Sequence, residues 1–179
     1  MSITFVTGNQ DKADYLARYL GMPLEHTKLT LEEIQSLDLQ KIVEHKARQA
    51  YTQLQRPVIV EDNSVEFDAL GGLPGPFIKF FVDHVPLEVI CGMIHGQSRG
   101  ATARTVMGYF NGTGLRLFET SLRGSIAQVP AGANSFGWDK IFIPDGYTIT
   151  RAQMDDADYQ TTYLKIKPLA QVKEFLLEG

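Results

Sequence analysis

Acidic side chains directly follow one short apolar segment of this sequence. Residues 58–81 read VIVEDNSVEFDALGGLPGPFIKFF, so Glu61 and Asp62 come just after the β-branched run Val58–Val60. Proteins usually hold Mg2+ with one or two carboxylates, and water and phosphate oxygens complete its coordination. Ligands of open α/β sheets bind at the carboxyl ends of strands. The pair therefore predicts a magnesium site at the end of a buried strand, with an acidic surface loop as the alternative.

A glycine-containing turn near the N-terminus has residues suited to phosphate. The segment FVTGNQDK, residues 5–12, has the pattern of a strand, a tight turn and the start of a helix. Gly8 allows the backbone to approach a ligand closely, and the free N–H groups of a helix N-terminus attract anions. Lys12 adds a full positive charge one turn into the helix. The segment predicts phosphate binding, although turns of this kind also occur as plain architecture.

One lysine falls on the apolar side of a predicted helix. Asp38 is placed to cap a helix that extends to Leu54, and at about 100° per residue its apolar residues form a single stripe. Lys46 lies within that stripe, between the directions of Ile42 and Val43. Lysine is rarely buried unless its stem covers the core and its ammonium reaches water, or unless it meets an anion. Both interpretations of Lys46 stay open.

Aromatic residues gather in a later segment. Residues 134–147 read NSFGWDKIFIPDGY, in which Asp139 follows Phe136 and Trp138 closely. Aromatic rings near a phosphate site would favour stacking with a nucleotide base, although packing is the commoner role of such rings.

Strand-like and helix-like segments that position these residues alternate along the chain. The predicted strands are Ile3–Val6, Leu24–Leu29, Val58–Val60, Ala101–Phe110 and Leu115–Arg123. The predicted helices are 11–20, 38–54, 86–94 and 169–177. This alternation, with an antiparallel pair in the middle, predicts a mixed α/β fold. The length of 179 residues and the apolar content of 44% predict one domain, residues 1–179.

Composition narrows the class of partner and the compartment. The formal net charge of −4 argues against binding to duplex nucleic acid. The single cysteine, Cys91, cannot form an internal disulfide, which fits a reducing compartment and a small apolar core residue. No apolar run approaches the roughly 18 residues of a membrane span, and the first residues do not resemble a signal peptide. We expect a cytoplasmic protein that binds neither membrane nor nucleic acid.

Together these segments resemble the inosine triphosphate pyrophosphatase (Ham1-like) family. The matching blocks are FVTGNQDK, EIQSLDLQKIVEHKARQAY, VIVEDNS, ALGGLPGPFIKFF and SFGWDKIFIPDGYT, in the family's order and spacing. The resemblance extends from about Ile3 to Met154. It implies a two-lobed, mixed-sheet α/β fold of the Maf/Ham1 (anticodon-hydrolase-like) type with a cleft between the lobes, and usually a homodimer. It also implies Mg2+-dependent hydrolysis of a nucleoside triphosphate, such as ITP, dITP or XTP, to the monophosphate and pyrophosphate.

The resemblance also assigns roles to individual residues. It places the triphosphate on Thr7, Gly8, Asn9, Lys12 and Lys46. It makes Glu33 and Asp62 the metal ligands, and Asp62 the group that activates the attacking water. It gives substrate contacts to Asn63 and to the loop residue Lys79, and it places the base beside Phe136, Gly137, Trp138 and Asp139.

The resemblance fails in the segment DDADYQTTYLKIKPLAQV after Met154. Where the family has a lysine and then Ser-His-Arg for recognising a 6-keto purine, this chain has Tyr159, Tyr163, Leu164 and Lys165. Leucine forms no hydrogen bond with a keto oxygen, and lysine lacks the planar fork of arginine. Lys165 is nevertheless expected to contact substrate.

Three hypotheses follow. The first is an active pyrophosphatase with altered or relaxed base preference. The second is a catalytically weak nucleotide-binding or regulatory homologue. The third is a hydrolase that acts on a different phosphoanhydride.

Overall fold

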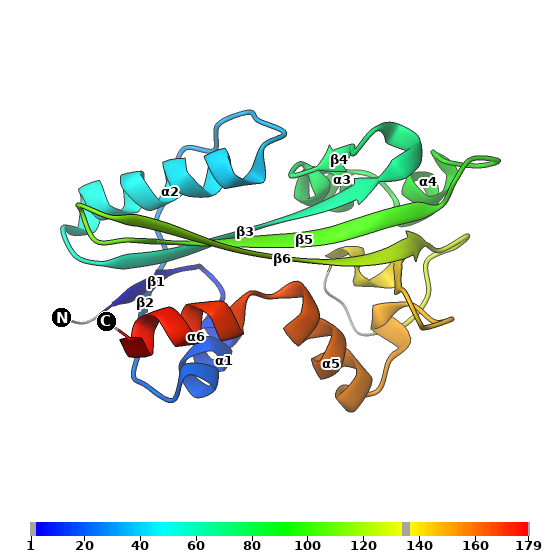
Figure 1. Ribbon diagram of the computed structural model, residues 1–179. Helices are drawn as coiled ribbons and strands as arrows, with labels where there is room; N and C mark the ends of the chain where they lie inside the picture. The colour runs from blue at the N-terminus through cyan, green and yellow to red at the C-terminus, as the bar shows by residue number, and fades with distance from the viewer. Residues whose placement is uncertain (1–2, 134–136, 179) are drawn as a thin grey trace. The chain divides into compact units, whose positions relative to one another are not determined.

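The structure is a computed structural model that describes residues 3–133 and 137–178. Its strands form one sheet in the order β2-β1-β3-β5-β6-β7, and β4 pairs with β3 (Figure 1). The strands are β1 Thr4–Val6, β2 Glu25–Thr27, β3 Val58–Phe67, β4 Pro74–Gly75, β5 Gly100–Phe110, β6 Leu115–Ile126 and β7 Phe142–Pro144. β1 is parallel to β2 and β3, whereas the pairs β3–β4 and β6–β7 are antiparallel. The predicted mixed α/β class is confirmed.

Helices follow the capping signals of the sequence. The α-helices are α1 Gln10–Leu20, α2 Leu39–Leu54, α3 Ile78–His84, α4 Leu87–Gly92, α5 Asp156–Ile166 and α6 Leu169–Glu178. Short 3-10 turns are η1 Asp68–Leu70, η2 Gly137–Lys140 and η3 Arg151–Gln153. Asp38 caps α2 as predicted, because its side chain accepts hydrogen bonds from the backbone N–H groups of Gln40 and Lys41.

The chain forms two compact units. Unit 1 comprises Met1–Asp62, Val106–Glu119 and Pro168–Gly179, and unit 2 comprises Asn63–Thr105 and Thr120–Lys167. The strands β3, β5 and β6 each contribute residues to both units.

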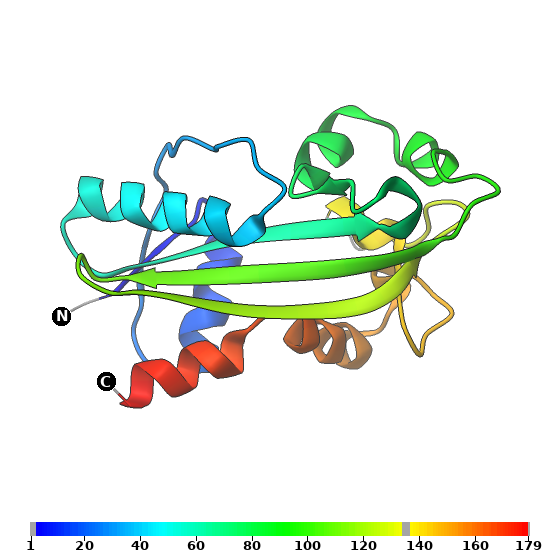
Figure 2. The same ribbon diagram turned by 45° about the horizontal axis from the view of Figure 1, so that its top comes forward.

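In unit 1, α2 lies on one face of the strands, and α1 and α6 lie on the other (Figures 1 and 2). The apolar stripe of α2 packs against β3 and β5 in a cluster that includes Val43, Ala47, Val60 and Val106. Lys173 of α6 donates a hydrogen bond to the backbone carbonyl of Tyr19 in α1 at 2.9 Å. These contacts fix the elements that carry Lys12, Lys46 and the carboxylates of β3.

Unit 2 has its own apolar core. Its buried members include Phe67, Ile90, Ala103 and Phe142. Cys91 is buried in the same cluster, which confirms its expected place among apolar core residues. Within the described residues, no helix is both long and apolar enough to span a membrane.

The structure differs from the predicted elements at β3 and in the segment after Met154, and it adds the short strands β4 and β7. β3 does not end at Val60 but continues to Phe67, because its alternate residues Val65 and Phe67 are buried in the core of unit 2. The segment after Met154, for which no helix was predicted, forms α5, which Asp155 caps through the backbone N–H of Asp158.

Candidate active site

The turn between β1 and α1 is organised by its own polar side chains. Asn9 caps α1, because its Oδ1 accepts a hydrogen bond from the backbone N–H of Lys12 at 3.1 Å. The backbone N–H of Asn9 in turn donates to Oγ1 of Thr7 at 3.1 Å. Thr7, Gly8 and Asn9 therefore form a tight turn at the N-terminal, partially positive end of an eleven-residue helix.

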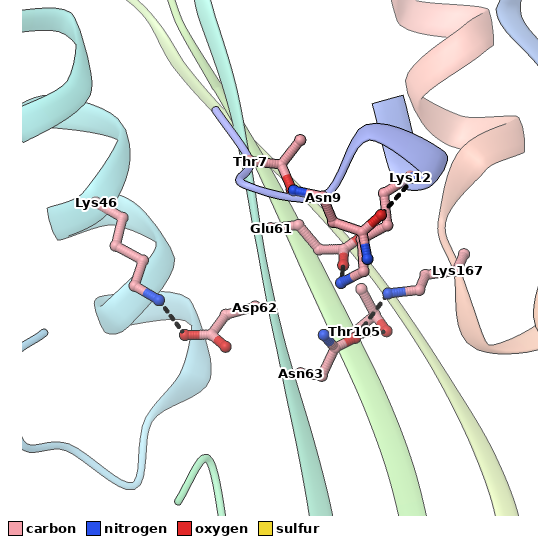
Figure 3. Close-up of polar contacts among 9 residues, drawn as sticks. All are labelled: Thr7, Asn9, Lys12, Lys46, Glu61, Asp62, Asn63, Thr105 and Lys167. Atoms are coloured by element: carbon pink, nitrogen blue, oxygen red, sulfur yellow. Dashed lines mark hydrogen bonds and ion pairs between the residues drawn. The ribbon is translucent and has the colours of Figure 1, made fainter. Parts of the chain in front are cut away.

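Lys12 projects from the first turn of α1 toward β3. Its Nζ lies 2.9 Å from Oε1 of Glu61, in an ion pair that is partly buried (Figure 3). The Glu61 carboxylate raises the pKa of Lys12, and this effect outweighs the opposing effect of burial. Lys12 therefore remains a fixed positive charge beside the turn.

Lys46 holds two carboxylates at once. Its Nζ lies 2.9 Å from Oδ2 of Asp62 and 2.8 Å from Oε1 of Glu33, and its side chain is only 12% exposed. Burial alone lowers the pKa of Lys46, but the two carboxylates together raise it above the ordinary lysine value. The sequence left open whether Lys46 reaches solvent or an anion; its ammonium meets these two anionic side chains.

The acidic pair of β3 does not form a single site. Figure 3 shows Asp62 with Lys46 on the α2 side of the strand and Glu61 with Lys12 on the α1 side. Successive side chains of a strand point to opposite faces, and β3 continues through both residues. The expectation that Glu61 and Asp62 share a metal at a strand end was therefore wrong. Glu33, from the segment before α2, is the carboxylate that accompanies Asp62.

In unit 2, Asn63 follows Asp62 on β3 and has two donors. Oγ1 of Thr105 donates to its Oδ1 at 2.7 Å, and Nζ of Lys167 donates to the same oxygen at 2.8 Å (Figure 3). Lys167 is 7% exposed and ends α5 immediately before Pro168. Its ammonium also lies 5.8 Å from the ring centroid of Tyr163.

Several other predicted site residues lie on α5, α3 and η2. Lys165 and Leu164 are exposed on α5, and Lys79 is exposed on α3. Gly137 begins η2 with a φ of +36°. Phe136 lies outside the described residues.

Asp139 is the buried centre of an ion-pair network. Nη1 of Arg151 donates to its Oδ1 at 2.8 Å, and the hydroxyl of Tyr159 donates to its Oδ2 at 2.9 Å. Burial raises the pKa of Asp139, and the positive charge of Arg151 opposes this rise. Burial, followed by the negative charge of Asp139, raises the pKa of Tyr159 to about 12. Trp138 packs edge-on against Phe142, with ring centroids 5.7 Å apart.

Sequence reasoning missed Lys167 and Arg151. Lys167 had one available signal, because a lysine between Ile166 and Pro168 interrupts an apolar helix end. Arg151 had none, since its partners Asp139 and Thr162 are distant in sequence.

Comparison with known proteins supports the resemblance over nearly the full chain. The Ham1 family model matches residues 3–175. The inosine triphosphate pyrophosphatase of Yarrowia lipolytica is 37% identical over 184 residues, which cover 99% of this chain and 97% of that protein. The inosine triphosphate pyrophosphatase of Batrachochytrium dendrobatidis is 40% identical over 180 residues, covering 97% and 93%.

Solved structures share the fold. The Ham1 protein of Staphylococcus aureus superposes with a TM-score of 0.87 at 21% identity, covering 99% of each chain. A nucleoside-triphosphatase (dITP/XTP pyrophosphatase) from Mycobacterium abscessus gives 0.81 at 23% identity, covering 96% of this chain and 98% of that one. The family expected from the sequence motifs is thus confirmed, and the chain belongs to the Ham1 family.

Proposed function

We propose that this protein is a nucleoside triphosphate pyrophosphatase that hydrolyses deaminated purine nucleotides, such as ITP, dITP and XTP, to the monophosphate and pyrophosphate. The observation that carries the proposal is the pair of carboxylates, Glu33 and Asp62, gathered on the ammonium of Lys46. This cluster lies in the same unit as the capped turn at residues 7–9 and the fixed charge of Lys12. Relatives named inosine triphosphate pyrophosphatase support the same reaction.

Glu33 and Asp62 would be the protein ligands of a divalent cation, which we propose is Mg2+. Among the described residues, no group of three or more His, Cys, Asp or Glu side chains is arranged to hold a metal. Mg2+ fits this donor set, because it needs only one or two carboxylates and takes its other oxygens from water and phosphate. Glu33 and Asp62 already converge on one cationic group, the ammonium of Lys46. When bound, the metal would neutralise charge on the phosphate oxygens.

The triphosphate would lie against the turn and the two lysines. Asn9 uses its side chain to satisfy the backbone N–H of Lys12, which leaves the preceding N–H groups of α1 for phosphate oxygens. Lys12 and Lys46 keep their positive charges because neighbouring carboxylates raise both pKa values. They would stabilise the negative charge that develops on the oxygens around the α-phosphorus.

Asp62 would act as the general base. A carboxylate within hydrogen-bond reach of a water takes its proton as the oxygen attacks the α-phosphorus. Pyrophosphate then leaves with the electrons of the broken P–O bond, so the products are the monophosphate and pyrophosphate. Lys46 already donates to Oδ2 of Asp62, which orients the carboxylate.

For the nucleoside part we propose contacts with Asn63 and with Lys167, whose ammonium donates to Asn63. Trp138, with the neighbouring Phe136, Gly137 and Asp139, would flank the base. In this proposal Lys167 replaces Lys165 as the lysine that contacts substrate, because Lys167 is buried against Asn63 whereas Lys165 is exposed. Lys79 would approach substrate from α3.

We propose that the protein is a cytoplasmic homodimer and that residues 1–179 act as one domain. Three exposed apolar side chains offer a surface for a second copy: Phe80 of α3, Val89 of α4 and Met93, which directly follows α4. Size-exclusion chromatography with light scattering tests this: Phe80→Asp should yield the monomer, whereas a monomeric wild type contradicts the proposal.

A substrate panel tests the proposed function. Wild-type protein with Mg2+ is incubated with ITP, XTP, dITP, ATP, GTP, CTP and UTP, and products are separated by ion-exchange chromatography. We expect ITP and XTP to yield monophosphate and pyrophosphate. Release of nucleoside diphosphate and inorganic phosphate would contradict cleavage at the α-phosphorus. Nucleotide binding without turnover would favour a regulatory homologue.

A further inference from the structure

Arg151 has a buried guanidinium, one nitrogen of which has no hydrogen-bond partner among the described residues. It is 3% exposed and lies in η3 of unit 2. Its Nη1 donates to Asp139 at 2.8 Å and its Nε donates to Oγ1 of Thr162 at 3.2 Å. Within residues 3–133 and 137–178, its Nη2 has no hydrogen-bond partner. Buried polar groups are nearly always paired, so a buried donor without an acceptor indicates that something else supplies one.

Two aromatic rings fix the orientation of this guanidinium. Its central carbon lies 4.5 Å from the ring centroid of Tyr159 and 5.4 Å from that of Trp138. Together with the ion pair to Asp139, these contacts hold the planar group in place. Nη2 is therefore a preorganised donor beside Trp138, the aromatic side chain proposed to flank the base.

Neutralising Asp139 does not by itself require an arginine. One N–H of the guanidinium donates a hydrogen bond to Oδ1 of Asp139, and the hydroxyl of Tyr159 donates one to Oδ2 of Asp139. The planar fork has further N–H groups on Nη2, and a guanidinium has no acceptor. Such a group can bind a carbonyl oxygen but offers nothing to an amino group at the same position.

We propose that Arg151 is a base-recognition residue whose Nη2 donates a hydrogen bond to the keto oxygen of a 6-keto purine. This inference rests on the proposed function and deepens it, because it names the group that selects the base. It accounts for specificity in a chain where Leu164 is exposed and Tyr159 is engaged with Asp139.

The test compares ITP with purine riboside triphosphate, which differs by lacking the 6-oxygen. We expect wild type to favour ITP in kcat/KM by about tenfold to a hundredfold, the range for a hydrogen bond to a charged donor. Arg151→Lys keeps a positive charge beside Asp139 but removes the planar fork of the guanidinium. It should lower kcat/KM for ITP until this value lies within a few fold of kcat/KM for purine riboside triphosphate. Tyr159→Phe is the matched control, because it loses a hydrogen bond to the same Asp139 and should keep the preference.

Equal loss on both substrates in Arg151→Lys would overturn the inference, since it would show a purely structural role. If Arg151→Lys does not fold, the wild-type protein alone tests the inference. Similar kcat/KM values for ITP and purine riboside triphosphate would then also overturn it. If wild type hydrolyses no triphosphate, the proposed function fails separately. The preference is then measured as calorimetric binding of IMP against purine riboside monophosphate, and equal affinities reject the role of Arg151.

Discussion

Glu61 and Asp62 are neighbours on β3, yet they pair with lysines on opposite sides of the strand. Glu61 contacts Lys12 of α1 at 2.9 Å, and Asp62 contacts Lys46 of α2 at 2.9 Å. Side chains of consecutive strand residues point to opposite faces. Two neighbouring carboxylates can therefore form ion pairs with lysines of two different helices. The two carboxylates therefore have different surroundings. Glu61 pairs with Lys12, whereas Asp62 shares Lys46 with Glu33, and we propose that Asp62 carries the chemistry.

Lys46→Met should lower kcat by about a hundredfold or more, the usual effect of removing one preorganised group that stabilises charge in the transition state. Methionine keeps the apolar stem on the inner face of α2, so the melting temperature should change little. Lys41→Met on the same helix is the control, because that side chain is 72% exposed and should leave kcat unchanged. Equal rates in the two variants would remove Lys46 from the mechanism.

Glu33→Gln should weaken the metal site without abolishing it. Asp62 remains as one carboxylate, so the Mg2+ concentration that gives half-maximal rate should rise about tenfold while the rate at saturating Mg2+ largely recovers. Glu32→Gln is the neighbouring control; Glu32 contacts Gln49 and His45 rather than Lys46. The rate of ITP hydrolysis is measured as a function of Mg2+ concentration for both variants. If Glu33→Gln and Glu32→Gln need the same Mg2+ concentration, Glu33 is not a metal ligand.

Lys167→Met should raise KM for ITP by about tenfold, since a hydrogen bond from a charged group typically contributes this much. The variant keeps the bond from Thr105 to Asn63, which limits the structural change. Lys165→Met is the control on the same helix, at an exposed position. Steady-state kinetics of both variants provide the comparison, and a larger effect at Lys165 would restore the sequence-based assignment.

Tyr159 should make stability sensitive to high pH. The unfolded phenol titrates near pH 10, whereas the folded one has a pKa of about 12. Because the folded pKa is the higher, the stabilisation is complete below about pH 10 and is lost as the pH rises through about 12. Urea unfolding at intervals from pH 9 to 12 should show a steeper loss of stability in wild type than in Tyr159→Phe. Parallel curves would mean that Tyr159 titrates normally.

Local signals in the sequence predicted much of unit 1. Asp38 and the apolar stripe predicted α2. The position of Lys46 within that stripe left two interpretations open, an ammonium that reaches solvent and an ammonium that meets an anion. These features follow from helix periodicity and capping, which are set by nearby residues. The end of β3 was predicted wrongly because the polar run from Glu61 to Ser64 resembles a loop. Only the long-range partners of its side chains reveal a strand.

The site in unit 2 depends on contacts that the sequence does not display. Asn63 and Lys167 are separated by 104 positions, and Arg151 and Asp139 belong to different turns. The family resemblance also weakens after Met154, where Lys165 stands at the position of the family's arginine and was therefore expected to contact substrate. The fold instead buries the lysine at the helix terminus, since Ile166 and Lys167 turn inward while Lys165 faces solvent.

Pyrophosphate release from ITP by wild type and Asp62→Asn, with Mg2+, tests the central claim most directly. Asparagine is nearly isosteric but cannot accept a proton, and a general base contributes about a hundredfold to ten-thousandfold. We predict rapid release by wild type and a loss of at least a hundredfold in the variant, while calorimetry shows that ITP still binds and the melting temperature is retained. Undiminished turnover by a folded Asp62→Asn would contradict the account.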